Sequence, residues 1–99
     1  MEITPFTSEL FDKLPENYKN WHLQNYETKE AFLEKAFGFY AVENGEVCCE
    51  SEAAFTAHGF TEIGIYTFEP YRNRGFAFAT CFKTLEELET MGLESNLGL

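Results

Sequence analysis

The sequence predicts an α/β (α+β) fold in which helices flank a mixed, mostly antiparallel sheet. Two apolar runs flank Asn44-Gly45, and this dipeptide is the strongest short signal for a β-hairpin, because the favoured turn needs positive φ at both central residues. A third apolar run, from about 60 to 68, extends the hairpin into a three-stranded antiparallel meander. An amphipathic stretch from about 75 to 91 then predicts a long helix.

The segment before the meander predicts one strand and two helices. MEITPF, at 1–6, reads as a short first strand that a proline ends. TSELFDKL, at 7–14, has a Ser or Thr cap followed by acidic residues and predicts a short helix. ENYKNWHLQNY, at 16–26, is polar and aromatic without a clear period, so we expect a loop. ETKEAFLEKAF predicts a second helix with Thr28 as its N-cap and Gly38 as its stop.

The meander strands are expected at about 39–43, 46–56 and 60–68, with AHGF as the second tight connection. Alternation gives the third strand two faces, one carrying Thr61, Ile63, Ile65 and Thr67, the other Glu62, Gly64, Tyr66 and Phe68.

The final helix should bury an apolar stripe, because five side chains recur at spacings of three and four: Phe78, Cys81, Phe82, Leu85 and Leu88. Gly92 lies just past its expected end. LESNLGL then predicts the start of one more strand. That strand would run parallel to the third, since a strand–helix–strand crossover joins the two.

The composition fits one folded domain over residues 1–99. Hydrophobic residues make up 44% of the chain and aromatic residues 17%, which argues against intrinsic disorder. Seven Lys and Arg against seventeen Asp and Glu give a formal charge of −10. A nucleic-acid partner is therefore not expected, because phosphate binding needs a basic surface.

The cysteines Cys48, Cys49 and Cys81 have no C-x-x-C spacing, so neither a disulfide framework nor a zinc site is expected. Neither histidine has a metal-ligand companion at a useful spacing, and we expect no metal. No signal peptide or run of about 18 apolar residues is present, so we expect a cytoplasmic protein without a membrane span.

The stretch EPYRNRGFAFAT, at 69–80, joins the third strand to the long helix. A helix N-terminus offers unpaired N–H groups and a positive dipole end, which together bind phosphate. Gly75 would allow close approach of the backbone, and Arg72 and Arg74 would add cationic donors. The alternative is an ordinary strand-to-helix loop with solvated arginines.

Arg72-Asn73-Arg74-Gly75-Phe76-Ala77 fits the pattern Gln/Arg-x-x-Gly-x-Gly/Ala, and on these residues the chain resembles the GNAT-type N-acetyltransferases. Gly38-Phe39-Tyr40-Ala41-Val42 and Glu62-Ile63-Gly64 match one branch, which includes proteins resembling the zwittermicin A resistance acetyltransferase. The resemblance runs from about Thr28 to Leu93.

This resemblance implies a GNAT-like fold with acetyl-CoA as cosubstrate. The coenzyme A pyrophosphate would be held by the loop and the start of the helix, through Arg72, Arg74, Gly75, Phe76, Ala77 and Thr80. Main-chain groups of Tyr66, Thr67 and Phe68 would pair with the pantetheine arm.

The implied reaction is attack by a small-molecule primary amine on the acyl carbonyl, for which a base must take a proton from the nitrogen. Glu62 and Glu69 are the candidate bases. The alternatives are a surface carboxylate for Glu62 and an ion pair with Arg72 or Arg74 for Glu69. Net acidity would favour a cationic acceptor.

GNAT domains usually continue with another helix and two strands, whereas this sequence ends at Leu99. We therefore expect a C-terminally shortened domain: a fragment, a naturally short relative, or a chain that completes its sheet with a second copy. An unfinished sheet exposes an edge that recruits partners, which favours a homodimer. The second functional hypothesis is a non-catalytic acyl-CoA-binding or dimerising remnant of such a domain.

Overall fold

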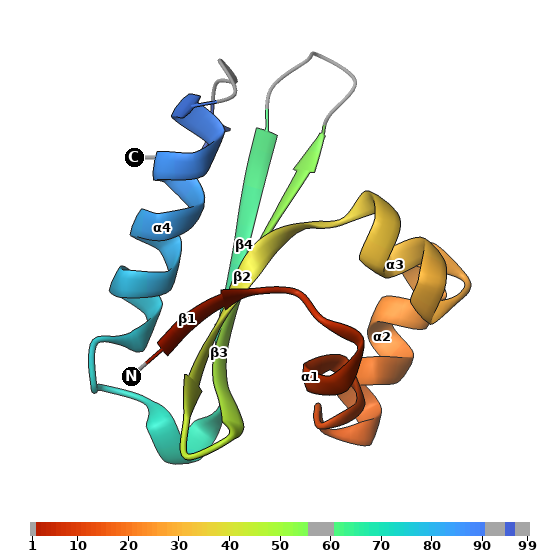
Figure 1. Ribbon diagram of the computed structural model, residues 1–99, viewed down its shortest axis with the longest axis horizontal. Helices are drawn as coiled ribbons and strands as arrows, with labels where there is room; N and C mark the ends of the chain where they lie inside the picture. Colours follow the sequence, from red (N-terminus) through yellow and green to blue (C-terminus); the bar gives the residue numbers. More distant parts are fainter. Residues whose placement is uncertain (1, 56–60, 91–94, 97–99) are drawn as a thin grey trace.

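The computed structural model describes residues 2–55, 61–90 and 95–96, and it arranges them as a sheet with helices on both faces (Figure 1). The elements follow in the order β1 (Glu2–Pro5), α1 (Ser8–Asp12), α2 (Glu16–Tyr26), α3 (Lys29–Lys35), β2 (Phe37–Glu43), β3 (Glu46–Phe55), β4 (Thr61–Thr67), the 3-10 turn η1 (Glu69–Tyr71), α4 (Phe76–Thr90) and β5 (Ser95–Asn96).

The five strands lie in the sheet in the order β1-β2-β3-β4-β5. The pairs from β1 to β4 are antiparallel, and β5 pairs in parallel with β4 at Thr61 and Glu62. The predicted meander and the parallel last strand are thus confirmed. Asn44 and Gly45 have the predicted positive φ, 54° and 78°. The expected AHGF turn and Gly92 lie outside the described residues.

Alternation along β3 divides the two layers. Cys49 and Ser51 point toward α4, where the hydroxyls of Ser51 and Thr84 are hydrogen-bonded at 2.9 Å. Glu50 points to the other face, where Tyr18 of α2 donates to its carboxylate. Figure 1 shows the same division, with α4 on one side of the sheet and α1, α2 and α3 on the other.

The helix α2 replaces the loop that was predicted for 16–26, and that prediction was wrong. The helix packs against the sheet through Tyr18, His22 and Tyr26, which recur every fourth residue. These side chains are amphipathic, so a search for an apolar stripe does not detect them. The predicted helices around 7–14 and 27–37 are confirmed, and Thr28 caps α3 by accepting from the Ala31 amide at 3.0 Å.

Gly38 does not end α3, as was predicted, because the helix stops at Lys35 with Ala36 as its C-cap. Gly38 instead lies within β2, opposite Glu52 of β3. A Cβ added there would overlap the Ser51 carbonyl oxygen and come within 2.6 Å of the Phe6 ring. The glycine is therefore required by close packing and not by a turn.

The long helix is confirmed at 76–90, but its buried face differs from the predicted stripe. The residues packed against the sheet are Phe76, Thr80, Thr84 and Leu88. Phe78 and Phe82 are 78% and 58% exposed and stack on each other at the surface. The two threonines satisfy their hydroxyls on carbonyls one turn earlier, which allows polar residues to occupy the helix–sheet interface.

Candidate active site

The predicted phosphate loop forms one wall of a cavity of about 610 Å³ between β4 and the start of α4. Asn73 and Gly75 both have positive φ, 64° and 81°, so the chain reverses sharply before the helix. The first helical amides have no intrahelical acceptor, and they lie at this cavity. Of the residues predicted to hold coenzyme A, six line it: Tyr66, Thr67, Arg72, Gly75, Phe76 and Ala77.

The two arginines of the loop differ in their surroundings. Arg72 Nε donates to the Thr67 carbonyl at 3.0 Å, and its guanidinium lies over the Tyr66 ring. Arg74 donates to the Glu43 carboxylate at 3.0 Å and lies over the Phe76 ring. Within the described residues, Arg72 has no carboxylate partner. Arg72 is thus the cation that an anion could reach without breaking an ion pair.

Arg74, Phe68 and Thr80 are not among the residues that line this cavity. Phe68 is buried and its amide donates to the Cys48 carbonyl at 2.9 Å. Thr80 is fully buried against the sheet. Because ladder hydrogen bonds alternate along a strand, the outward backbone groups of β4 belong to Ile65 and Thr67. In the described chain, β5 covers the edge of β4 only at Thr61 and Glu62.

A second cavity, of about 460 Å³, adjoins the first and shares Ile65 and Tyr66 with it. Its remaining wall comes from α2, β3 and β4, through Asn17, Tyr18, Trp21, Glu50, Glu52 and Gly64. The two hollows therefore meet along β4, one beside the helix N-terminus and the other beside a pair of carboxylates.

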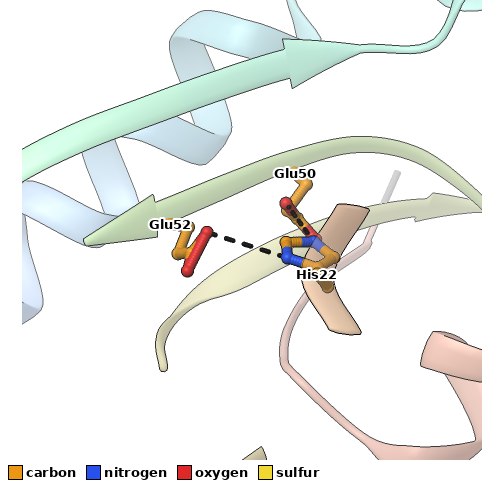
Figure 2. Close-up of side chains that lie close together, drawn as sticks. All are labelled: His22, Glu50 and Glu52. Atoms are coloured by element: carbon orange, nitrogen blue, oxygen red, sulfur yellow. Dashed lines mark hydrogen bonds and ion pairs between the residues drawn. The ribbon is translucent and has the colours of Figure 1, made fainter. Parts of the chain in front are cut away.

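Behind this second cavity, His22 lies between Glu50 and Glu52 (Figure 2). Its Nε2 is 2.9 and 3.0 Å from the two Glu50 oxygens, and its Nδ1 is 4.0 Å from Glu52 Oε1. An ionised carboxylate only accepts hydrogen bonds, so Nε2 carries the hydrogen. The set has the ligand types of a metal site, with ligand atoms within 4.8 Å of one another.

Two tyrosine hydroxyls complete this network. Tyr18 donates to Glu50 Oε2 at 2.8 Å, and Tyr26 donates to Glu52 Oε2 at 2.6 Å. Burial is the main cause that raises the pKa of both tyrosines, and the neighbouring carboxylates add to it. Burial also raises the pKa of the Glu52 carboxyl, helped by the Glu50 charge and opposed by Tyr26 and His22. Both tyrosines therefore stay protonated donors at neutral pH.

The two predicted bases are not placed in this network. Glu62 belongs to β4, where it pairs with Ala54, but its side chain lies outside the described set. Glu69 is exposed in η1, lines neither cavity, and forms no ion pair with either arginine among the described residues.

Sequence reasoning missed Glu50, Glu52 and His22. The signal that could have found the carboxylates is their alternation in β3, where each stands between buried small residues.

The cysteines offer no nucleophile. All three are free thiols, and burial is the first cause that raises the pKa of each. A thiol with a raised pKa carries little thiolate at neutral pH.

No helix in the described part of the chain is long and apolar enough to cross a membrane.

The comparison with protein families decides the classification. The family model of GNAT acetyltransferases matches residues 1–95 of the sequence. The chain belongs to the GNAT acetyltransferase family. No curated protein matches the sequence.

Solved structures share the GNAT fold with this chain. A GCN5-related N-acetyltransferase-like protein from Streptococcus suis superposes with a TM-score of 0.77 at 23% identity, over 96% of this chain and 39% of its own. The aminoglycoside antibiotic 6'-N-acetyltransferase from Acinetobacter haemolyticus superposes with a TM-score of 0.66 at 20% identity, over 100% of this chain and 81% of its own.

The NatB acetyltransferase complex bound to CoA gives a TM-score of 0.50 at 17% identity, over 91% of this chain and 65% of its own. This chain thus spans well under half of the Streptococcus suis protein and about two-thirds of the NatB chain.

Proposed function

We propose that this GNAT chain binds acetyl-CoA at the junction of β4 and α4 and transfers the acetyl group to a primary amine. The observation that carries the proposal is the meeting of two cavities at Ile65 and Tyr66. One cavity offers helix amides and a cation, and the other offers carboxylates. Acetyl transfer to an amine needs both chemistries side by side, since an anionic cosubstrate must meet a basic acceptor.

The first cavity fits the pyrophosphate of coenzyme A in three respects. The α4 N-terminus supplies unpaired amides and the positive end of the helix dipole. A Cβ placed on Gly75 would meet nothing within 4 Å, so the approach to these amides is open. Arg72 would turn from the Thr67 carbonyl to the phosphate, and that movement would free the edge of β4 for strand-like pairing with the pantetheine arm.

Isothermal titration of the full chain with acetyl-CoA tests the cofactor half of this proposal. We expect binding that Arg72→Ala weakens about tenfold, because a charge-assisted hydrogen bond contributes about 1.5–3 kcal/mol. Lys83→Ala is the charge-matched control, since Lys83 lies on α4 outside the first cavity and pairs with Glu86 and Glu87. Equal loss in both variants would mean that only net charge matters and would contradict the loop assignment.

Mass spectrometry of an amine panel incubated with acetyl-CoA tests the transfer itself. An acetylated product supports the enzyme, and binding of acetyl-CoA without any product would favour the second hypothesis, a non-catalytic acyl-CoA-binding remnant.

Within the family, the zwittermicin A resistance branch remains a proposal that rests on Gly38–Val42 and Glu62–Gly64. The homodimer also remains a proposal, which light scattering of the purified chain would test.

A further inference from the structure

The second cavity joins carboxylates to aromatic faces. Glu50 and Glu52 reach it from β3, and three rings form its walls: Tyr18, Trp21 and Tyr66. The Tyr18 ring lies 5.1 Å from that of Tyr66 and 5.7 Å from that of Trp21, measured between centroids. Aromatic faces attract cations through their quadrupole, and carboxylates attract them by charge. This combination favours an ammonium group over a neutral or anionic one.

The hydrogen bonds decide which carboxylate can receive such a group. Glu50 is almost fully buried, and its two oxygens already accept from Tyr18 and from His22 Nε2. Glu52 accepts from Tyr26 through Oε2 alone. Its side chain is 12% exposed, and Oε1 has no hydrogen-bond donor among the described residues. Glu52 Oε1 is therefore the open acceptor on the cavity wall.

An independent observation points to the same place. His22 is completely buried, yet its Nδ1 has no hydrogen-bond partner in the described structure. Figure 2 shows this nitrogen directed at Glu52, and the 4.0 Å between Nδ1 and Oε1 is too long for a hydrogen bond. Buried polar atoms are normally paired. The unpaired nitrogen and the open carboxylate oxygen face each other, so one small polar group could form hydrogen bonds to both.

We propose that the cavity lined by Tyr18, Trp21, Glu50, Glu52 and Tyr66 binds the ammonium form of an aliphatic primary amine, and that Glu52 takes the proton that makes this amine nucleophilic. The inference rests on the proposed function and names the substrate class and the base of the same site. Glu50, held by Tyr18 and His22, supplies a second negative charge. A carboxyl whose pKa is raised by burial is also a stronger base than an exposed one.

In the proposed reaction the amine nitrogen loses two protons and gains the acetyl group. The ammonium gives one proton to Glu52 Oε1, and the neutral nitrogen attacks the carbonyl carbon of the acetyl thioester. The N–C bond forms and the C–S bond breaks, and the electron pair of that bond leaves with the coenzyme A sulfur. The nitrogen's second proton passes to that sulfur, and Glu52 releases its own proton to water. An acetamide, free coenzyme A and one proton result.

Fluorescence of Trp21 gives a test that needs no turnover, because it is the chain's only tryptophan and lines the cavity. The full chain is titrated with 1,4-diaminobutane, and with 1,4-butanediol as the uncharged analogue, in buffer containing EDTA to exclude a bridging metal. We expect saturable quenching by the diamine and none by the diol. Glu52→Gln should weaken diamine binding at least about tenfold, whereas Glu34→Gln, which neutralises an exposed carboxylate on α3, should not.

Equal binding of the diamine and the diol, or unchanged binding in Glu52→Gln, would overturn the inference. Acetyl transfer to the same diamine separates binding from proton transfer. If Glu52 is the base, Glu52→Gln lowers kcat at saturating amine by about 10²–10⁴-fold, and a rise in KM alone would refute that role. Loss of acetyl-CoA binding with intact diamine binding would overturn the proposed function instead, so the two failures are distinguishable.

Discussion

At the scale of single residues, Glu52 links stability to pH. Burial, assisted by the Glu50 charge, raises the pKa of its carboxyl above the ordinary value of 4.5. The unfolded chain therefore loses this proton at a lower pH than the folded chain. Folding stability from this group is complete below the unfolded pKa, falls as pH rises through the folded pKa, and stays low above it.

We predict that Glu52→Gln removes this loss of folding stability at rising pH. The amide can still accept from Tyr26, and it carries no charge to desolvate. The difference in unfolding free energy between Glu52→Gln and the native chain should grow as pH rises from 4.5 and favour the variant at neutral pH. Urea titrations at several pH values measure it. A difference that shrinks with pH would mean that the ionised carboxylate stabilises the fold, and Glu34→Gln provides the exposed control.

Two glycines on either side of β3, one in β2 and one in β4, make a matched pair. At Gly38 an added Cβ overlaps the Ser51 carbonyl oxygen, whereas at Gly64 it meets nothing within 4 Å. We predict that Gly38→Ala lowers the free energy of unfolding by about 3 kcal/mol, as overpacking does when backbone must move. Gly64→Ala should change it by less than about 0.5 kcal/mol. Denaturant unfolding compares them, and equal effects would show that strand propensity and not packing governs Gly38.

At the scale of elements, the sequence predicts well where a pattern is local. The Asn44-Gly45 turn, the Thr28 cap and the position of the β4 strand depend on near neighbours, and all three are confirmed. The errors arise where tertiary contacts select the face. α2 is held by hydroxyls and an imidazole that meet carboxylates on β3, more than twenty residues away. Hydropathy along the chain does not identify such distant polar partners.

The orientation of α4 gives a direct test of the structure against the sequence pattern. The stripe of spacings predicted burial of both Phe82 and Leu88, but Phe82 is 58% exposed and Leu88 only 1%. We predict that Leu88→Ala destabilises the fold by about 2–5 kcal/mol, while Phe82→Ala costs less than about 0.5 kcal/mol. Thermal unfolding of the two variants decides. A large loss for Phe82→Ala would show that this face is covered in solution.

At the scale of the whole molecule, the two halves of the candidate site differ in how far the sequence predicts them. The cofactor half is contiguous, because one loop and one helix start form most of it, and the motif from Arg72 to Ala77 predicts it. The acceptor half joins α2, β3 and β4. In the sequence, Glu50 and Glu52 cannot be distinguished from surface carboxylates. Only the folded position of β3 shows that they line the second cavity. The sequence therefore indicates the proposed cosubstrate but does not indicate Glu52, the proposed base.

The charge of the whole chain also has a measurable effect. The net charge is −10, and the molecule extends over 35 × 31 × 20 Å. At 0.01 M salt the Debye length is about 30 Å, so charges across most of the molecule interact and the excess negative charge is net repulsive, whereas at 0.15 M the Debye length is about 8 Å. Self-repulsion destabilises a compact state.

We therefore predict that Tm at neutral pH rises by several degrees when NaCl increases from about 0.01 to about 0.15 M. Differential scanning calorimetry measures the shift. The control is the same pair of salt concentrations near the isoelectric point, about 4.5, where the net charge vanishes and the rise should nearly disappear. An equal rise at both pH values would assign the effect to general salting-out of apolar surface and would show that net repulsion does not limit the stability of this fold.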